Sequence, residues 1–291
     1  MKNEIQAAAV IVLYNPDLHT IKLINICLST FELVVVVNNG ASNDFIETLG
    51  QNDKLNLINN KKNYGLATAF NQGLSKSFSN INIDAVVLFD QDSEINLNFS
   101  NDMKNSYMKA INQGVKIACI GPMLIDMKSP DAKIHYEKID TSFLLPVDTI
   151  ASSGSLIPRV AYDAIGPMLD SLFIDCVDHE WCHRANSKNY GVFVDVNIKL
   201  NHDMGENYIS YFGQYKPVYR SPIRHYYIVR NTIFLAKLTY VPLRWKLVEL
   251  LKTVRRLIYY AIVSNSKLKS ISLMIRAIKH GLCNQLGELK T

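Results

Sequence analysis

The chain has 291 residues and a net charge of +5, and 48% of its residues are hydrophobic against 20% charged. This composition excludes a disordered or low-complexity chain, and the length predicts one elaborated domain or a domain with an appendage. Because the chain has no apolar run of about 18 residues, no secretory signal pattern and no CxxC pair among its five cysteines, we expect a cytoplasmic protein without structural zinc.

Continuous apolar runs, typical of strands buried on both faces, recur through the first 120 residues. They lie at residues 7–14, 33–37, 55–58, 85–89 and 116–120. Helical spacing of apolar residues separates them, at residues 18–28, 65–78 and 99–112. This alternation predicts an α/β fold with a mostly parallel sheet flanked by helices, and it places ligands beyond the carboxyl ends of the strands.

The rest of the chain is irregular at first and then helical. Residues 122–149 predict a hairpin or a mobile loop that closes over a bound ligand. Shorter elements follow, with helices at 159–165 and 177–187 and a strand at 191–200. Beyond residue 221 the pattern is helical to about residue 279, with breaks near Pro242 and Ser264.

Positive charge is concentrated at the end of the chain. Residues 241–291 hold ten lysines and arginines but only Glu249 and Glu288 as acids. Residues 243–262 mix Leu, Ile, Trp and Tyr with Lys and Arg, as in a helix that lies in a membrane interface. A helix packed on the protein with a solvated basic face has the same pattern, so both interpretations stay open. Since no nucleic-acid-binding motif accompanies the charge, we expect no nucleic-acid partner.

Two aspartates follow the fourth predicted strand. Asp90 and Asp92 stand in the sequence VVLFDQDSEI, directly after four apolar residues. Carboxylates two residues apart at the end of a strand are able to share one hard cation, which favours Mg²⁺ or Mn²⁺. A turn whose aspartates cap the next helix is the alternative. The position at the carboxyl edge of the sheet favours the metal site.

Polar residues also follow the first two predicted strands. Tyr14 and Asn15 follow the first, while Asn38 and Asn39 follow the second, next to Gly40. Short polar side chains there are able to bind a base or a ribose, although ordinary turns use the same residues. Further along, the helix that begins at NYGLATAFNQG lacks both common phosphate-loop patterns, which argues against an ATPase and a dehydrogenase.

A second acidic cluster lies in the sequence FIDCVDHEWCHR. Asp175, Asp178 and Glu180 stand at the start of a predicted helix, where negative charge is stabilised and a carboxylate is able to act as a general base. An ion pair between Glu180 and Arg184, four residues apart, is the structural alternative. The same segment contains HEWCH, which matches the HExxH zinc pattern at His179, Glu180 and His183, so a zinc hydrolase stays open.

Taken together, eight segments resemble the family 2 inverting glycosyltransferases with the GT-A fold, and especially their bacterial rhamnosyltransferase branch. They run in the family's order over roughly residues 7–231 and are VIVLYNP, VVVVNNGASND, NYGLATAFNQGL, VVLFDQDS, SSGSLI, FIDCVDHEWCHRA, HDMGE and RHYYIVRN. The resemblance implies a Rossmann-like GT-A domain over residues 1–220, which binds a nucleotide sugar and catalyses its transfer. Residues 221–291 would form a basic helical extension.

The resemblance also implies a role for individual residues on the donor side. Asn15, Asn38 and Asn39 would line the pocket of the nucleotide base, and Asp90 and Asp92 would bind the metal, with Asp92 the direct ligand. The other residues implied on this side are Tyr14, Asn63, Gly65, Asn71, Gln91, Arg224 and Arg230. The family usually has Asp at position 38; the asparagine carbonyl is still able to accept the N3–H of uracil or thymine, but the charge is lost.

On the acceptor side, the resemblance implies that Asp178 is the catalytic base. Gly154, Glu180 and Trp181 would lie near the acceptor, and His202 would approach the metal or the diphosphate. A single displacement would then invert the anomeric carbon. Against this stand a zinc hydrolase that uses His179, Glu180 and His183, and a sugar-nucleotide binding protein without activity.

The segments DQD and VDHEWCHR look most like the rhamnosyltransferase branch, and this resemblance implies dTDP-L-rhamnose as the donor. The expected acceptor is a hydroxyl of a glycan, carried by a lipid, in the synthesis of O-antigen, capsule or another cell-surface polysaccharide. We therefore expect a cytoplasmic enzyme in peripheral contact with the inner face of the membrane through its basic helices. A homo-oligomer is compatible with the sequence.

Overall fold

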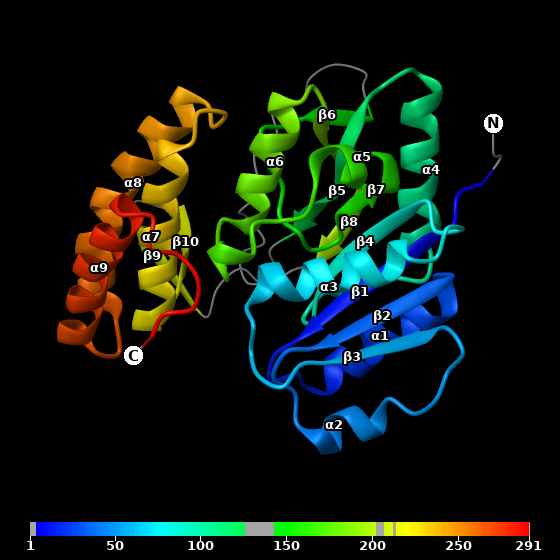
Figure 1. Cartoon of the computed structure of the whole chain (residues 1–291), viewed down its shortest axis with the longest axis horizontal. Coiled ribbons are helices and arrows are strands. Elements are labelled where there is room, and N and C mark those ends of the chain that lie inside the picture. Colours follow the sequence, from blue (N-terminus) through cyan, green and yellow to red (C-terminus); the bar gives the residue numbers. More distant parts are fainter. Residues whose placement is uncertain (1–3, 126–142, 202–206, 212–213, 291) are drawn as a thin grey trace.

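The computed structural model describes residues 4–125, 143–201, 207–211 and 214–290. An eight-stranded sheet in the order β3-β2-β1-β4-β7-β5-β8-β6 forms its centre (Figure 1). The strands are β1 (Ala7–Leu13), β2 (Leu33–Asn38), β3 (Leu55–Asn59), β4 (Ala85–Asp90), β5 (Ile117–Ile125), β6 (Leu144–Pro146), β7 (Leu156–Pro158) and β8 (Gly191–Asn201). Strands β3, β2, β1 and β4 pair in parallel, as do β5 and β8, so the predicted mostly parallel sheet is confirmed.

Helices cover both faces of the sheet, because its apolar runs present side chains to both sides. On one face, α1 (Leu18–Thr30) and α4 (Phe99–Asn112) pack around Phe31 and Phe89. On the other, α3 (Leu66–Phe78), α5 (Arg159–Ile165) and α6 (Val177–Ser187) pack around Phe70 and Trp181. A short helix, α2 (Asn43–Thr48), and a 3₁₀ turn, η1 (Asp170–Leu172), lie outside these layers.

The antiparallel elements are not predicted by the sequence. Strand β7 pairs antiparallel with both β4 and β5, and β6 with β8. A separate hairpin of β9 (Asn207–Tyr211) and β10 (Gln214–Val218) lies where the sequence predicts loop. Residues 126–142, most of the segment predicted as a closing loop, lie outside the described residues, so closure stays a prediction.

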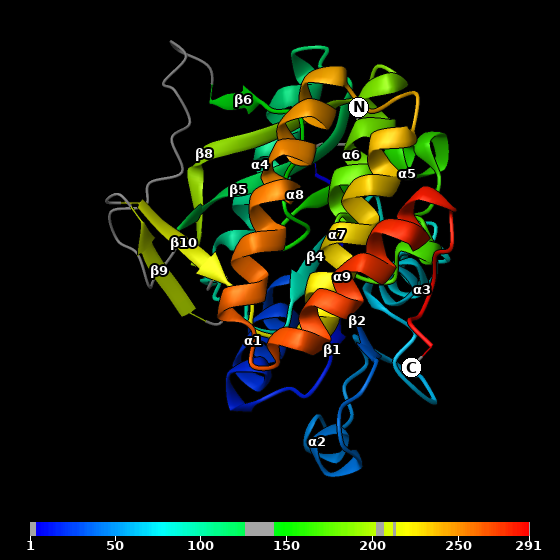
Figure 2. The same cartoon turned by 90° about the vertical axis from the view of Figure 1, so that its left-hand side faces the viewer.

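Three helices form the C-terminal part, with breaks at Pro242 and Ser264 as predicted. They are α7 (Pro222–Lys237), α8 (Leu243–Val263) and α9 (Lys267–Leu282). Helix α7 lies between the sheet domain and the other two, and its Leu235 belongs to the same core as α3 and α6 (Figures 1 and 2). Its contact with α9 requires Gly281, because a Cβ there would lie 2.7 Å from the Arg230 carbonyl. Over the ranges described, the helices are too short or too polar to cross a membrane.

Candidate active site

The carboxyl ends of four parallel strands meet at one edge of the sheet. In the register of the sheet, Asn38 at the end of β2 lies beside Leu13 of β1 and Asn59 of β3. On the other side of β1, Asp90 at the end of β4 lies beside Val12. The polar residues that follow these strands therefore gather at one edge, as the sequence predicts.

The residues that follow β1 are fixed by the segment that follows β4. The Gln91 side chain accepts a hydrogen bond from the Tyr14 backbone N–H at 2.7 Å and donates one to the Tyr14 carbonyl at 2.9 Å. Asn15 has a φ of 51°, a left-handed conformation that asparagine tolerates, and its N–H donates to the Gly40 carbonyl at 3.3 Å. Gln91 thus joins the ends of β1 and β4, while the ring of Tyr14 stays exposed beside them.

The Asn38 side chain closes the turn after β2. Its oxygen accepts hydrogen bonds from the backbone N–H groups of Gly40 at 3.1 Å and Ala41 at 2.7 Å, and its amide donates to Asn59 at 3.1 Å. The residue is buried, and both lone pairs of the oxygen are used. The sequence predicts that this oxygen accepts a hydrogen bond from a nucleotide base. In the structure it accepts from the loop backbone instead.

Asn39 and Asn63 join the loops that follow β2 and β3. The Asn39 amide donates to the Asn63 side-chain oxygen at 2.8 Å, and its own oxygen accepts from the Tyr64 N–H at 2.9 Å. Asn63 also accepts from the Gly65 N–H at 2.8 Å. Gly65 has a φ of +88°, and a Cβ there would lie 2.6 Å from the Phe173 carbonyl oxygen. Glycine is therefore required where α3 approaches the segment before α6.

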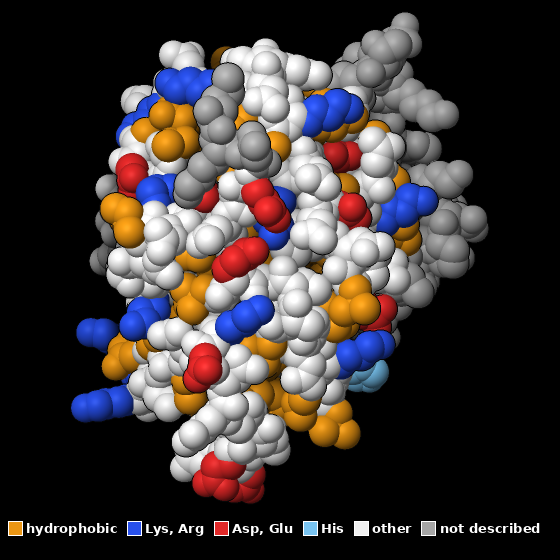
Figure 3. All heavy atoms as spheres, turned by 90° about the vertical axis from the view of Figure 1, so that its right-hand side faces the viewer, with side chains coloured by type: hydrophobic (Ala, Val, Ile, Leu, Met, Phe, Trp, Pro, Cys, Tyr) orange, Lys and Arg blue, Asp and Glu red, His pale blue; other side chains and the backbone are white. Residues whose placement is uncertain are grey.

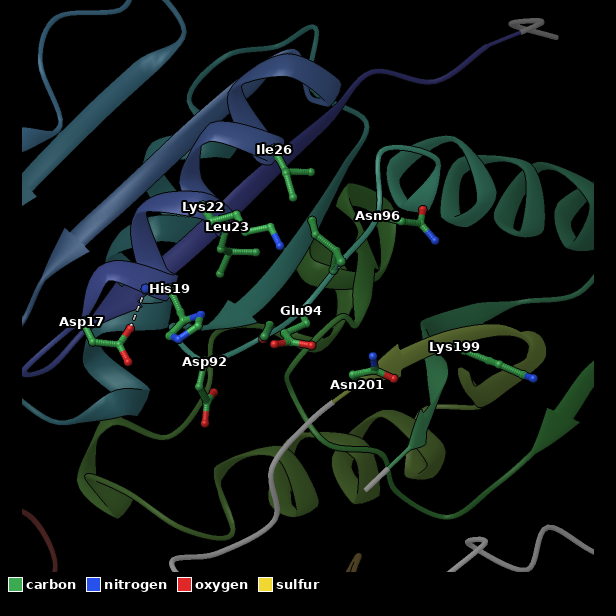
Figure 4. A pocket seen from close by; sticks show the side chains of 12 residues that line it. Asp17, His19, Lys22, Leu23, Ile26, Asp92, Glu94, Asn96, Lys199 and Asn201 are labelled. Carbon is green, nitrogen blue, oxygen red and sulfur yellow. Dashed lines mark hydrogen bonds between the residues drawn. The ribbon is translucent and has the colours of Figure 1, made fainter. Parts of the chain in front are cut away.

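A cavity of about 640 Å³ opens beside Asp92, which is exposed. Figure 4 shows its lining, which comes from the start of α1, from the segment after β4 and from the end of β8. The polar residues labelled there are Asp17, His19, Lys22, Asp92, Glu94, Asn96, Lys199 and Asn201. Asp90 is half-buried and is separated from Asp92 by Gln91, so the two predicted metal ligands flank the residue that fixes β1 to β4.

A strained turn precedes α6. Phe173, Asp175 and Cys176 have φ values of 67°, 62° and 61°, a region that residues other than glycine rarely adopt. Each such residue costs about 1–3 kcal/mol and persists only where its surroundings fix it. The turn presents the Asp175 carboxylate, and Asp178 follows as the second residue of α6. Strain of this kind clusters at functional sites, which singles out this acidic turn.

Two buried residues of α7 hold the strained turn. The Asn231 side-chain amide donates to the carbonyls of Leu172, Ile174 and Asp175 at 3.0, 2.7 and 2.9 Å. The neighbouring Arg230 guanidinium donates to the Leu172 carbonyl at 2.9 Å. Because Arg230 and Asn231 are almost completely buried, these hydrogen bonds are shielded from water and fix the turn firmly.

Arg224, at the start of α7, connects the two acidic clusters. Its Nε lies 3.4 Å from Asp175 Oδ1, and its guanidinium lies over the Tyr219 ring at 3.9 Å. Burial alone would lower the pKa of Arg224, but Asp175, Tyr219 and Asp90 outweigh it and raise the pKa. Burial raises the pKa of Asp175; Arg224 opposes this shift and Asp178 adds to it. Asp90 and Asp178 are therefore both within electrostatic reach of the Arg224–Asp175 pair.

Comparison with known proteins agrees with this arrangement. Residues 10–154 match the family described as Glycosyl transferase family 2. The chain is also 33% identical over 289 residues to dTDP-rhamnosyl transferase RfbF of Shigella flexneri, covering 93% of this chain and 92% of that protein. The chain belongs to glycosyl transferase family 2. It is a glycosyltransferase, and this identity is at odds with both the zinc-hydrolase alternative and a binding protein without activity.

Other proteins are similar to this glycosyltransferase in sequence or in fold. The chain is 23% identical over 277 residues to low-salt glycan biosynthesis hexosyltransferase Agl10 of Haloferax volcanii, covering 87% of this chain and 84% of that protein. The structure of S. aureus TarS in complex with UDP-GlcNAc superposes with a TM-score of 0.58 at 14% identity, covering 96% of this chain and 81% of TarS. The structure of GalNAc-T7 with UDP, GalNAc and Mn²⁺ superposes with a TM-score of 0.54 at 14% identity, covering 92% of this chain and 59% of that chain. The predicted GT-A fold is confirmed.

Several residues predicted to contact donor or acceptor lie elsewhere in this glycosyltransferase. The Arg230 guanidinium is almost completely buried and donates to the Leu172 carbonyl of the strained turn. Glu180 is fully buried, with its carboxylate bound by Arg184 at 2.8 Å and by the Tyr240 hydroxyl at 2.5 Å. Trp181 is also buried, and its indole N–H donates to a backbone carbonyl. These predictions assumed that polar or aromatic residues near a motif face the ligand. The packing of α6 buries Glu180 and Trp181 instead, and the packing of α7 buries Arg230.

Two other predicted residues support the backbone. The Asn71 side chain accepts from the Met168 N–H at 2.9 Å and donates to the Met168 carbonyl at 2.8 Å, so it fixes the segment that leads to η1. Gly154 is buried and donates its N–H to the Leu88 carbonyl of β4 at 2.7 Å. His202, predicted to approach the metal, lies outside the described residues.

The HExxH match does not form a zinc site in the described structure. His179 Nδ1 lies 2.8 Å from the Thr149 hydroxyl, and the rings of His179 and His183 lie against Trp245 of α8. Glu180 is bound by Arg184, as stated above. Among the residues that the structure describes, no group of three or more His, Cys, Asp and Glu side chains is placed to hold a metal ion.

The end of β4 offers oxygen ligands for a divalent cation. Asp90 and Asp92 are the carboxylates there, and hard oxygen ligands are the ones that Mg²⁺ and Mn²⁺ prefer. A cation held by one or two carboxylates takes its remaining ligands from water and from the phosphates of the bound nucleotide. The two aspartates therefore fit a cation that arrives with the donor.

Sequence reasoning missed the residue that holds the site together. Asn231 stands last in RHYYIVRN, next to the arginine that the resemblance singled out, but nothing in the sequence shows that its amide reaches three carbonyls about 56–59 residues away. The aromatic partner of Arg224, Tyr219, was also missed. The one available signal was the presence of an asparagine among apolar residues at helical spacing, where a buried amide requires partners.

Proposed function

We propose that this glycosyltransferase moves L-rhamnose from dTDP-L-rhamnose to a hydroxyl of a glycan acceptor, with inversion of the anomeric carbon. The observation that carries the proposal is the 33% identity to a dTDP-rhamnosyl transferase along nearly the whole of both chains. A lipid-linked acceptor in the synthesis of O-antigen, capsule or another surface polysaccharide fits this donor, and it would place the enzyme at the inner face of the cytoplasmic membrane.

Asp178 is the proposed general base. It stands in the first turn of α6, and its Oδ1 accepts the N–H of His179 at 2.8 Å. It would take the proton of the acceptor hydroxyl as the oxygen attacks the anomeric carbon, on the face opposite the leaving nucleotide. The turn that carries it is held by Asn231, so the carboxylate is positioned before substrate binds.

Arg224 and the β4 aspartates would bind the donor. The Arg224 guanidinium is held on the Tyr219 ring and beside Asp175, in reach of Asp90, so it is oriented toward the end of β4. Asp90 and Asp92 would hold Mg²⁺ or Mn²⁺, which neutralises the diphosphate as it leaves. Tyr14 and Asn15 lie exposed at the same edge, where a base is able to stack or bond.

The test is release of nucleotide from a panel of donors: dTDP-rhamnose, UDP-glucose, UDP-galactose, UDP-N-acetylglucosamine and GDP-mannose. Each is incubated with a lipid-linked glycan extract and Mg²⁺, Mn²⁺ or EDTA. We expect release from dTDP-rhamnose that requires the metal. Nucleotide release only from another donor would refute rhamnose as the transferred sugar. Release that persists in EDTA would refute the requirement for a divalent cation.

The variant Asp178→Asn tests the base. We expect turnover to fall by at least about a thousandfold while the affinity for dTDP stays within about twofold, since the base acts on the acceptor. Asp163→Asn, on the surface of α5, is the matched control and keeps full activity. Unchanged turnover of Asp178→Asn excludes the assignment.

A further inference from the structure

Helix α8 turns its apolar side away from the protein. Six large apolar residues, which we call the α8 stripe, follow one another at spacings of three and four and lie on one side of the helix. They are Leu243, Leu247, Leu251, Val254, Ile258 and Ile262. Each is between 55% and 70% exposed. A surface helix normally buries such a stripe, so α8 has the opposite orientation.

The inner side of α8 is polar and aromatic. Thr253 and Tyr260 are its buried residues, and Trp245 packs against His183 of α6. Glu249 is on this side as well, bound by Lys252 at 2.7 Å and by Arg256 at 2.9 Å. These contacts fix which side of the helix faces inward. The exposure of the stripe is therefore a consequence of specific packing.

Positive charge borders the stripe. Arg244 precedes Leu247 by three residues and Arg255 follows Leu251 by four, so both lie along its edge, and both are exposed. Helix α9, which packs beside α8, adds further exposed residues of both kinds: Lys267, Leu268, Lys269, Ile275, Arg276 and Lys279.

Negative charge is scarce on α8 and α9 themselves, where Glu249 is the one acid. The two acids beyond residue 241, Glu249 and Glu288, are bound by lysines or arginine. On the opposite face of the molecule, Figure 3 shows acidic and basic side chains interspersed with scattered apolar ones.

We propose that the α8 stripe and the cations along it bind the surface of a membrane that contains anionic phospholipid. An apolar stripe bordered by Lys and Arg, with acids absent from its edges, is the arrangement by which an amphipathic helix lies in a membrane interface. The apolar side chains enter the boundary of the acyl chains, while the guanidinium and ammonium groups contact phosphate headgroups. A second copy of the chain would carry the same positive charge and repel the first.

This surface lies close to the acidic turn. Burial raises the pKa of Asp175, and Arg256, on the inner side of α8, is among the cations that oppose this rise, so the two are in electrostatic reach. A helix with its side chains is about 10 Å across. The stripe lies on the side of α8 that faces away from the acidic turn. If the acceptor is lipid-linked, which is part of the proposed function, binding through the stripe brings the site to its hydroxyl.

The test is sedimentation of the full chain with vesicles, without donor or acceptor, so that it is independent of the proposed transfer. One set of vesicles contains equal parts of phosphatidylglycerol and phosphatidylcholine, and the other contains phosphatidylcholine alone. We expect the protein to bind the anionic vesicles and to dissociate as salt is raised. The double variant Leu251→Gln and Ile258→Gln should bind about tenfold or more weakly. Val160→Gln, an equally exposed residue on α5, is the matched control and should bind as the wild type.

A second pair of variants separates charge from apolar contact. Arg244→Gln with Arg255→Gln should weaken binding to anionic vesicles while leaving the circular dichroism spectrum unchanged. Wild-type protein that stays in solution with both kinds of vesicle at low salt overturns the proposal, as does unchanged binding of the Leu251 and Ile258 variant. Light scattering that shows a dimer, which that variant converts to a monomer, also overturns it and identifies a second copy as the occupant.

Discussion

Helices α7 and α8 are neighbours in the chain, yet α7 buries most of its residues, polar ones included, whereas α8 buries very few. Ten of the sixteen residues of α7 are buried, including Arg230 and Asn231, whereas only Thr253 and Tyr260 of the twenty-one in α8 are. Helix α7 therefore places its polar groups inside, where they hold the acidic turn. Helix α8 leaves its apolar groups outside. The comparison teaches that neighbouring helices of one basic tail differ in what they contact: α7 holds the acidic turn, whereas α8 leaves an apolar stripe exposed.

The largest effect is expected where α7 holds the turn. Asn231→Leu keeps the branched shape of the side chain but removes the amide that donates to the carbonyls of Leu172, Ile174 and Asp175. A turn with three residues of positive φ thereby loses its support from this side chain. We expect a loss of about 3 kcal/mol in the free energy of unfolding and a roughly hundredfold fall in kcat. Urea unfolding and steady-state kinetics measure the two.

Thr232→Val is the control for Asn231, because it is the next residue of α7, equally buried and nearly the same size. Its hydroxyl lies 4.0 Å from the Cys176 sulfur, a weak contact, so its substitution should change both quantities little. If Asn231→Leu is as active as Thr232→Val, the turn is held without α7.

The next effect concerns the arginines at the starts of the two helices. Arg224→Ala in α7 removes the cation that lowers the pKa of Asp175, so the pKa of this carboxyl rises further. We expect kcat/KM to fall by about 10- to 100-fold, and the acid limb of its pH profile to move to higher pH, since more of the site is protonated at a given pH. Arg244→Ala, at the start of α8, should leave the profile unchanged. Equal profiles for both variants would contradict the difference between the helices.

The elements of the fold were predictable where one local pattern determines them. Strands β1, β2 and β4 were located because each is a continuous apolar run, and the ends of α7 and α8 because Pro242 and Ser264 interrupt the helical pattern. Strand β7 was not, since three residues carry no periodicity and its pairing with β4 and β5 depends on tertiary contacts.

The site was predictable only in part, for the same reason. Asp90 and Asp178 stand where strand and helix ends must place them. Arg230 and Glu180 look similar in the sequence, as charged residues within a motif, but their burial depends on which side of a helix meets the core. Whether such a side chain is buried depends on hydrogen-bond partners that lie far along the chain. These are the Leu172 carbonyl for Arg230 and the Tyr240 hydroxyl for Glu180.

The contact between α6 and the inner side of α8 should depend on pH. Burial lowers the pKa of His183 to about 4, and neither ring nitrogen has a hydrogen-bond partner among the described residues. Because the unfolded chain protonates this histidine near pH 6.5 and the folded chain only near pH 4, stability is lost as the pH falls between these values. We expect this group to reduce the free energy of unfolding by about 2 kcal/mol from pH 7 to pH 5.

His183→Phe tests this, because it keeps a ring against Trp245 and removes the titration. The difference in urea midpoint between pH 7 and pH 5 should shrink in the variant. His19→Phe, at an exposed histidine, should behave as the wild type. An unchanged difference in His183→Phe means that other groups cause the acid sensitivity.

The smallest effect is expected on the outer side of α8, and it is the sharpest check of the comparison. Leu251→Gln replaces a side chain that is 70% exposed, so the free energy of unfolding should change by less than about 0.5 kcal/mol. Leu235→Gln in α7 replaces one that is fully buried and should cost about 3 kcal/mol or more. A large loss for Leu251→Gln would show that the stripe is already covered in the purified protein, because an apolar side chain in water contributes little to folding. The two helices would then both face inward, one toward the sheet and the other toward a second chain.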